Sequence, residues 1–202
     1  MLSNSFYHLN RGLHMHLGLV LLFFIWLFSL SGLILNHGNW KFASFWEERN
    51  ESKTEFTLPL YALDQPDIEN QVLKLLAIKG EVQQVKRTPG VVEFSIQSPG
   101  IAREVHVDLR TGAGTQKVLK YNLWGKLRTL HTFNGMKKEN PAQSPNWLVT
   151  NIWRFTMDGI AFGLIIITVS SWIMWFKIRK EYKFGYLALF SGFAFAAYFI
   201  FG

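Results

Sequence analysis

The most prominent hydrophobic pattern in the chain is an uncharged run from Leu13 to Leu35, which follows a polar N-terminal segment, residues 1–12. A helix of roughly 23 residues is about 35 Å long, and the hydrocarbon core of a bilayer is about 30 Å thick. A cleaved signal peptide has a shorter apolar region, of about 7 to 15 residues, followed by a small-residue cleavage site that is missing here. The pattern therefore predicts a permanent membrane-spanning helix over residues 13–36.

Two further apolar runs lie near the C-terminus. They cover residues 147–176 and 184–202, and the basic stretch 177–183 separates them. Basic residues favour the cytoplasmic ends of spanning helices, and residues 1–12 carry Arg11 close to the first run. We therefore expect residues 1–12 and 177–183 to be cytoplasmic. Residues 37–146 and the C-terminus then lie outside, which in a Gram-negative cell means a protein of the inner membrane with a periplasmic domain.

Between the first two apolar runs, the pattern changes to that of a small α+β domain. Apolar residues at helical spacing predict an amphipathic helix that begins at Asp67 and ends near Gly80. Val105, Val107 and Leu109 alternate with polar residues, as in a strand with one dry face. Four such runs are bounded by turn residues: Glu81–Arg87, Val91–Gln97, Ala102–Leu109 and Thr115–Tyr121. The charged segment Glu47–Thr57 is predicted to be a linker or loop.

Two shorter patterns lie next to the predicted spans. The segment Tyr121–Gly135 has apolar residues at three-residue steps among basic ones, which predicts a short helix in the membrane surface. Ser29, Ser31 and Gly32 form a small-residue patch near the end of the first span. Small residues let helices approach closely, so this patch is interpreted as a packing seam for a second helix.

Composition and charge narrow the class of protein. Of the 202 residues, 49% are hydrophobic and 16% aromatic, as is typical of a small membrane protein. The net charge of +7 does not indicate a nucleic-acid partner, because residues 37–146 contain 15 Lys and Arg against 12 Asp and Glu. The chain has no cysteine, which excludes disulfides, thiolate chemistry and iron–sulfur ligation by its own residues.

Several motifs together resemble the PepSY-associated transmembrane family. They are the Leu13–Leu19 segment LHMHLGL, the Ser31–His37 segment SGLILNH, the Leu130–Gly135 segment LHTFNG, and the Val107–Gly112 turn VDLRTG within the predicted helix and strand order. The resemblance covers nearly the whole chain. It implies an α-helical membrane protein in which a small α+β, PepSY-like extracytoplasmic domain, about residues 56–121, is inserted between the first and second of three transmembrane helices.

The resemblance also carries functional expectations. Some larger relatives are inner-membrane ferric-siderophore reductases, in which histidines hold haems near each membrane face. His14 corresponds to the histidine of the first motif and His131 to that of the Leu-His motif. The second and third predicted spans contain no histidine, so His14 lacks a partner within the chain. A dimer, a partner subunit or a single outer haem is therefore required.

The positions of the histidines suggest haem b independently, because paired imidazoles between helices are a common haem ligation. His14 and His37 are about 35 Å apart along one helix and do not share an iron. His37 and His131 are both expected at the outer face. They are the one intrachain pair that the sequence suggests, and simple hydrogen bonding at the membrane interface is the alternative for each histidine.

Two functions therefore stay open. The first is a non-enzymatic accessory subunit that lies in the lipid bilayer, binds other membrane subunits or a second copy, and presents the outer domain to a larger complex. The second is a haem b electron-transfer protein of the siderophore-reductase type, with His37, His131 and His14 as candidate ligands. No catalytic residue is predicted, because nucleophile and base constellations and phosphate-binding loops are missing from the sequence. No metal other than haem iron is expected.

Overall fold

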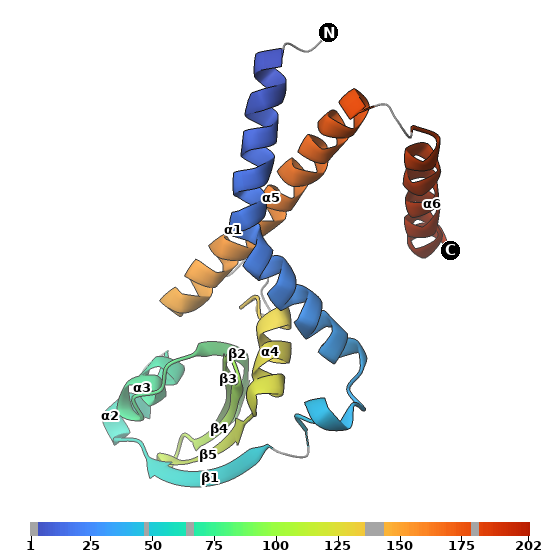
Figure 1. Ribbon diagram of the computed structural model, residues 1–202. Helices are drawn as coiled ribbons and strands as arrows, with labels where there is room; N and C mark the ends of the chain where they lie inside the picture. The colour runs from blue at the N-terminus through green and yellow to red at the C-terminus, as the bar shows by residue number, and fades with distance from the viewer. Residues whose placement is uncertain (1–3, 47–48, 64–66, 136–143, 179–181) are drawn as a thin grey trace. The chain divides into compact units, whose positions relative to one another are not determined.

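The computed structural model describes residues 4–46, 49–63, 67–135, 144–178 and 182–202. Among them, three helices are long and apolar enough to cross a membrane (Figure 1): α1 (Asn4–Asn36), α5 (Leu148–Ile178) and α6 (Tyr182–Phe201). They coincide with the three apolar runs of the sequence. Helix α1 begins well before residue 13, because the polar residues that precede the apolar run contain no helix-breaking proline.

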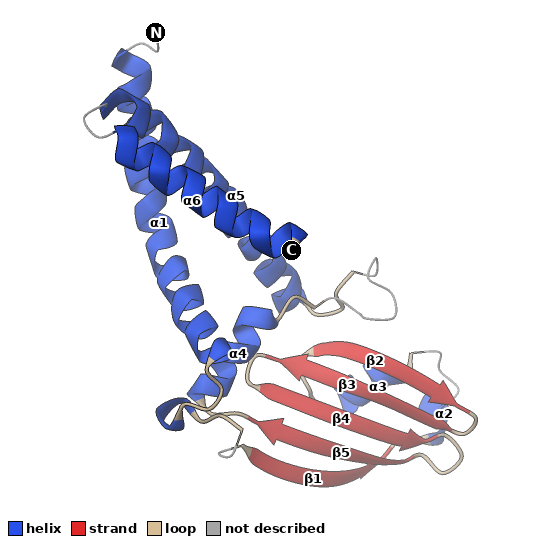
Figure 2. Ribbon diagram, turned by 90° about the vertical axis from the view of Figure 1, so that its right-hand side faces the viewer, coloured by secondary structure: helices blue, strands red, loops and turns tan. Residues whose placement is uncertain are grey.

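A five-stranded antiparallel sheet lies between α1 and α5 in the sequence, in the order β1-β5-β4-β3-β2 (Figure 2). Its strands are β1 (Asn50–Thr57), β2 (Glu81–Thr88), β3 (Val91–Ser98), β4 (Ile101–Asp108) and β5 (Ala113–Lys120). The remaining elements are the short helices η1 (Lys41–Ala43), α2 (Leu60–Leu63), α3 (Ile68–Leu75) and α4 (Leu123–Thr132). The predicted α+β domain, its four strands and its amphipathic helix are therefore present, although the helix ends at Leu75 rather than near Gly80. The short helix predicted within Tyr121–Gly135 is α4.

The fifth strand, β1, corrects the sequence prediction. The segment Glu47–Thr57 was expected to be a linker or loop, but Asn50–Thr57 pairs along its whole length with β5. Residues 47–48 lie outside the described part of the chain. Strand β1 shows no alternation of apolar and polar residues, because it is an edge strand with only Phe56 half-buried. Hydrophobic patterning therefore gave no sign of it.

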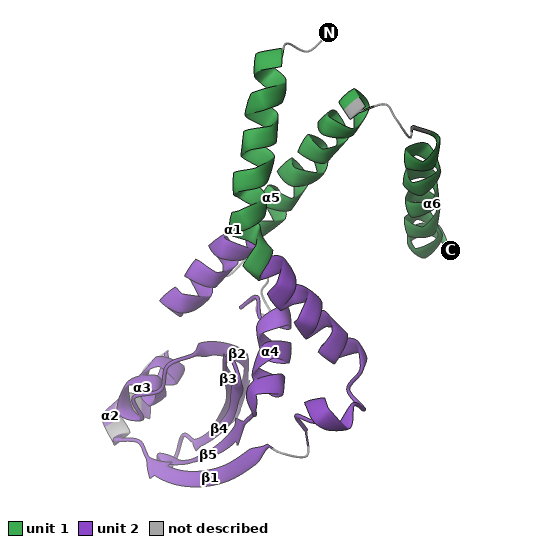
Figure 3. Ribbon diagram, in the orientation of Figure 1, with its two compact units in different colours: residues 1–23, 160–202 green, residues 24–159 purple. Residues whose placement is uncertain are grey.

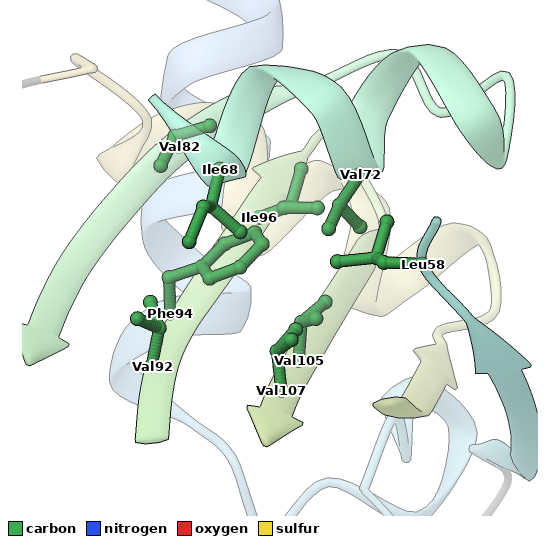
Figure 4. Close-up of a cluster of buried hydrophobic side chains, with 9 residues drawn as sticks. All are labelled: Leu58, Ile68, Val72, Val82, Val92, Phe94, Ile96, Val105 and Val107. Atoms are coloured by element: carbon green, nitrogen blue, oxygen red, sulfur yellow. The ribbon is translucent and has the colours of Figure 1, made fainter. Parts of the chain in front are cut away.

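The sheet domain has one core, between α3 and one face of the sheet (Figure 4). Ile68 and Val72 project from α3 toward the sheet, where they meet apolar side chains of three strands. The residues of this cluster are Leu58, Ile68, Val72, Val82, Val92, Phe94, Ile96, Val105 and Val107. The alternation predicted for the third strand is confirmed, because Val105 and Val107 are buried whereas Glu104 and His106 are exposed.

The two edges of the sheet differ. Strand β1 pairs with β5 in an unbroken register. Strand β2, at the other edge, has a bulge between Gln83 and Lys86, and Gln84 adopts a left-handed φ of 50°. A bulge of this kind increases the local twist of a strand and disrupts its hydrogen-bonding ladder.

The chain divides into two compact units, residues 1–23 with 160–202 and residues 24–159 (Figure 3). In the first unit, α1 and α5 run antiparallel. Near the chain's N-terminal end, Lys177 Nζ donates to Asn4 Oδ1 at 3.0 Å. One turn and a half further, Asn10 Nδ2 donates to the carbonyl of Ser170 at 3.2 Å, and both residues are buried. Ser170 Oγ returns a bond to the Asn10 carbonyl at 3.4 Å, so polar groups specify how these helices pair.

Candidate functional site

The second unit contains a junction where the sheet domain meets membrane-type helices. We use "junction" for α4 together with the C-terminal part of α1, the N-terminal part of α5 and the sheet residues that contact them, all within residues 24–159. His131, the histidine of the Leu-His motif, lies near the end of α4. The junction is therefore the first candidate functional site.

His131 is held against α1. Its Nδ1 lies 2.8 Å from Ser31 Oγ, and its ring meets that of Phe28 edge-on with the ring centroids 5.4 Å apart. A Cβ added to Gly32 would lie 3.5 Å from His131 Cε1, so the glycine allows the ring to approach the helix backbone. Ser31 and Gly32 of the predicted small-residue patch thus pack on the short helix α4, whereas Ser29 is exposed.

Ser31 Oγ lies between two polar groups. It is 2.8 Å from His131 Nδ1 and 3.2 Å from the Phe28 carbonyl, to which the hydroxyl is able to donate. Ser31 is therefore the hydrogen-bond partner that α1 offers to the imidazole.

Replacing Ser31 by alanine tests this contact. Ser31 is almost fully buried, so the variant loses the hydroxyl and leaves His131 Nδ1 without this hydrogen-bond partner. We expect the free energy of unfolding to fall by about 1 kcal/mol, as measured by chemical denaturation of the full chain in mild detergent. Ser29→Ala is the matched control, because Ser29 is exposed on the same helix. Equal effects of the two changes would contradict the assigned role of Ser31.

His37 has different neighbours. Its Nδ1 donates to the Leu33 carbonyl one turn earlier at 2.9 Å, and its ring stacks on Trp40 at a centroid distance of 4.3 Å. His37 directly follows the last residue of α1, six residues after Ser31, which corresponds to about 9 Å along the helix axis. Since His131 is bonded to Ser31, the structure does not bring the His37 and His131 rings together.

His37 and His131 have separate neighbours in this structure. Bis-imidazole ligation requires the two rings to face each other across one iron, whereas each ring here packs on its own aromatic neighbour. Among the described residues there is no group of three or more His, Cys, Asp or Glu side chains suited to a metal ion. Haem binding by this pair stays a prediction, and an oxidised-minus-reduced spectrum of protein expressed with added haem tests it.

His14 belongs to the other unit and is described by itself. It lies on α1 one turn after Asn10, and its Nδ1 is buried with no hydrogen-bond partner among the described residues. A buried polar atom without a partner is unusual in a folded protein. The structure therefore gives His14 a different environment from those of His37 and His131.

A buried acidic residue, Glu81, was not singled out in the sequence analysis. It begins β2 and is fully buried. Its carboxylate accepts the backbone N–H of Asn146 at 2.8 Å and that of Trp147 at 3.1 Å. In return, Asn146 Oδ1 accepts the N–H of Val82 at 3.0 Å. Since α5 begins at Leu148, Glu81 binds the chain at the N-terminus of a membrane-type helix, where a negative charge is stabilised.

Helix α4 connects the same sheet to α1 and α5. Thr129 Oγ1 accepts the N–H of Gly100, in the β3–β4 turn, at 3.0 Å. Asn122 caps α4 by accepting the N–H of Gly125 at 3.0 Å. Trp153 of α5 donates its indole N–H to the carbonyl of Phe133, just after α4, at 2.9 Å. Helix α4 and the residue after it are therefore hydrogen-bonded to the sheet, to α5 and, through His131, to α1.

The second candidate surface is the face of the sheet opposite α3, which we name the polar face. It carries a shallow groove of about 600 Å³, and charged side chains of five strands line it. Lys117 Nζ lies 2.8 Å from Glu51 Oε1, and His106 Nδ1 lies 3.0 Å from Glu93 Oε1. The hydrogen bond from Lys117 lowers the pKa of Glu51, and the same bond raises the pKa of Lys117. This mixed-charge surface is suited to binding a protein rather than a polyanion.

Comparison with protein-family models, with curated proteins and with solved structures finds no match to this chain. Its function is therefore inferred from its own residues and geometry.

Proposed function

We propose that this chain is a membrane-anchored interaction subunit, which presents its sheet domain in one orientation to a partner in a larger membrane complex. The observation that carries this proposal is the buried Glu81 carboxylate at the start of α5. A domain that acts alone needs only a flexible tether. Here a buried charge satisfied by two backbone N–H groups fixes the domain to the helix, and a displaced Glu81 is costly because it leaves these groups unpaired.

The polar face is the surface that such a partner contacts. Its neighbouring charges of both signs favour recognition by a protein with complementary charges, and electrostatic complementarity of this kind determines specificity and orientation. The helical faces of α1, α5 and α6 bear many exposed apolar side chains, which suit lipid and neighbouring membrane subunits. The resemblance of the sequence motifs to the PepSY-associated transmembrane family supports the same function.

The proposed location follows from charge. The positive-inside rule supports a bacterial inner-membrane protein, with the N-terminus and residues 177–183 in the cytoplasm and the sheet domain in the periplasm. Labelling of single cysteines tests this topology, because the chain has none of its own. We expect a membrane-impermeant reagent to label a cysteine introduced at exposed Thr88 in intact spheroplasts, and one introduced at exposed Asn4 only after lysis.

The test of function is co-purification under gentle extraction. We expect the full chain to migrate on native gels in a heteromeric complex of fixed stoichiometry. The variant Lys86→Glu, on the polar face, should weaken that complex, whereas Lys41→Glu, at an exposed position outside the sheet, should not. A chain that functions as a lone monomer, or a complex that tolerates both changes equally, would refute the proposal.

A further inference from the structure

Within the described part of the chain, strand β1 is an open edge of the sheet. It pairs with β5 on one side, and seven of its eight residues are exposed. It contains neither proline nor a register shift. A long, regular edge of this kind presents a row of backbone N–H and C=O groups that can pair with another strand.

The backbone of β1 fixes which residues are able to pair outward. Beyond Thr57, which faces Ala113, the N–H of Leu58 donates to the carbonyl of Gly112 at 2.8 Å. Hydrogen-bonding groups alternate sides along a strand, so the even-numbered residues of β1 bond to β5. The odd-numbered residues, Glu51, Lys53 and Glu55, therefore direct their N–H and C=O groups to the open edge.

The same odd-numbered positions carry charges of alternating sign. Arg49, directly before β1, is followed on the same side of the strand by Glu51, Lys53 and Glu55. Read in the opposite direction, the order of signs is inverted. An antiparallel copy of β1 therefore places a negative side chain opposite each positive one, and the segment is complementary to itself. Within its own chain, Glu51 also pairs with Lys117 and Arg49 stacks on Trp46, so each would share its charge between two partners.

Charge selects among the registers of such a pair. With Ser52 opposite Ser52 of the second copy, Glu51 faces Lys53 and Arg49 faces Glu55, each twice by symmetry. Moving the centre by one residue, to Glu51 or to Lys53, places like charges opposite each other, which is destabilising. A centre at Thr54 keeps only the two Lys53–Glu55 pairs. The register centred on Ser52 therefore has the most favourable cross-strand pairs.

We propose that β1 is a homodimerisation edge, at which two copies of this chain join antiparallel through β1 with Ser52 on the two-fold axis. The occupant of the edge is thus a second copy of the chain. The two sheets become one continuous sheet, and the alternating charges of Arg49, Glu51, Lys53 and Glu55 set its register.

Cysteine cross-linking tests the register in the full chain in membrane vesicles, since the protein has no cysteine of its own. In the proposed register, residue 52 faces its own copy in a pair without backbone hydrogen bonds, where the Cα atoms are about 4.5 Å apart and a disulfide is able to form. Residue 54 of one copy is then about 13 Å from residue 54 of the other along the strands. We expect Ser52→Cys to give roughly tenfold more oxidised dimer than Thr54→Cys under mild copper-phenanthroline oxidation.

Charge variants test the complementarity. Lys53→Glu places Glu opposite Glu51 of the second copy, and cross-linking of the Ser52→Cys protein should fall several-fold. Within one chain this change is mild, because residue 53 faces Lys117 in the β1–β5 register. Adding Glu51→Lys exchanges the two charges and should restore cross-linking, as well as the mobility of the dimer on native gels without any cysteine.

Three results would overturn the proposal. They are the absence of a cross-linked dimer with Ser52→Cys, an equal or larger yield with Thr54→Cys, and a yield that does not change with Lys53→Glu. Ser52 and Thr54 are both exposed on the same strand, so either cysteine should leave the fold intact. The comparison of Ser52→Cys with Thr54→Cys leaves the charges of the polar face unchanged, so failure of the dimer and failure of the heteromeric complex, which is measured with Lys86→Glu, are distinguishable.

Discussion

Replacing Glu81 by alanine is expected to lower the free energy of unfolding by about 3 kcal/mol. The side chain is fully buried and accepts two backbone N–H groups at the start of α5. The alanine variant leaves both donors without their acceptor and removes the negative charge from the helix N-terminus. Chemical denaturation of the full chain in detergent, followed by tryptophan fluorescence, measures the effect.

Two further variants distinguish the loss of the Glu81 hydrogen bonds from the loss of a negative charge. Glu81→Gln keeps one acceptor oxygen and the shape of the side chain, and we expect a loss of about 1 to 2 kcal/mol. Glu104→Ala removes an exposed carboxylate from the same sheet and should change stability by less than about 0.5 kcal/mol. A loss for Glu104→Ala as large as that for Glu81→Ala would contradict the role assigned to the buried carboxylate.

Replacing Gly135 by alanine is expected to be similarly damaging, with a loss of about 3 kcal/mol. Gly135 has a φ of 66°, a conformation that side chains with a Cβ adopt only at a cost. An added Cβ would also collide with Thr150 Cγ2 of α5, and Thr150 is fully buried. Since backbone strain and overlap act together, the segment after α4 would have to move away from α5.

The control for this change is Gly159→Ala. Gly159 also lies in the unit of residues 24–159, within α5, and a Cβ there would meet nothing within 4 Å. Alanine has the higher helix propensity, so this variant should be neutral or more stable by up to about 1 kcal/mol. Limited proteolysis of the chain before α5 gives a second readout, with faster cleavage expected only for Gly135→Ala. If both variants were equally stable, the close contact between Gly135 and Thr150 would be refuted.

The parts of this fold that the sequence predicted well depend on local patterns. The three apolar helices, the amphipathic helix with Ile68 and Val72, and the alternation at Val105 and Val107 follow from residues close together in the chain. Strand β1 was missed for the same reason. An edge strand that is exposed over nearly its whole length shows no alternation of apolar and polar residues. Its structure comes from pairing with β5, about 60 residues later in the chain.

The junction required information that no local pattern contains. Glu81 looks like an ordinary polar strand residue, and the groups that satisfy it, at Asn146 and Trp147, are more than 60 residues away. The sequence correctly placed His131 on a short helix, but periodicity does not tell which neighbour the imidazole meets. The structure gives it Ser31, and that choice depends on how closely α4 approaches α1 beside Gly32.

The bulge at Gln84 has a consequence for assembly. It twists the β2 edge away from regular pairing, so that edge is a poor template for another strand. If two copies join through β1, each one buries its regular edge and presents only the bulged one. Growth then stops at two chains, because a two-fold contact is closed while a head-to-tail contact between β1 and β2 would propagate as a filament. In such a dimer, the distorted residue Gln84 would therefore favour a closed pair of chains over an open-ended array.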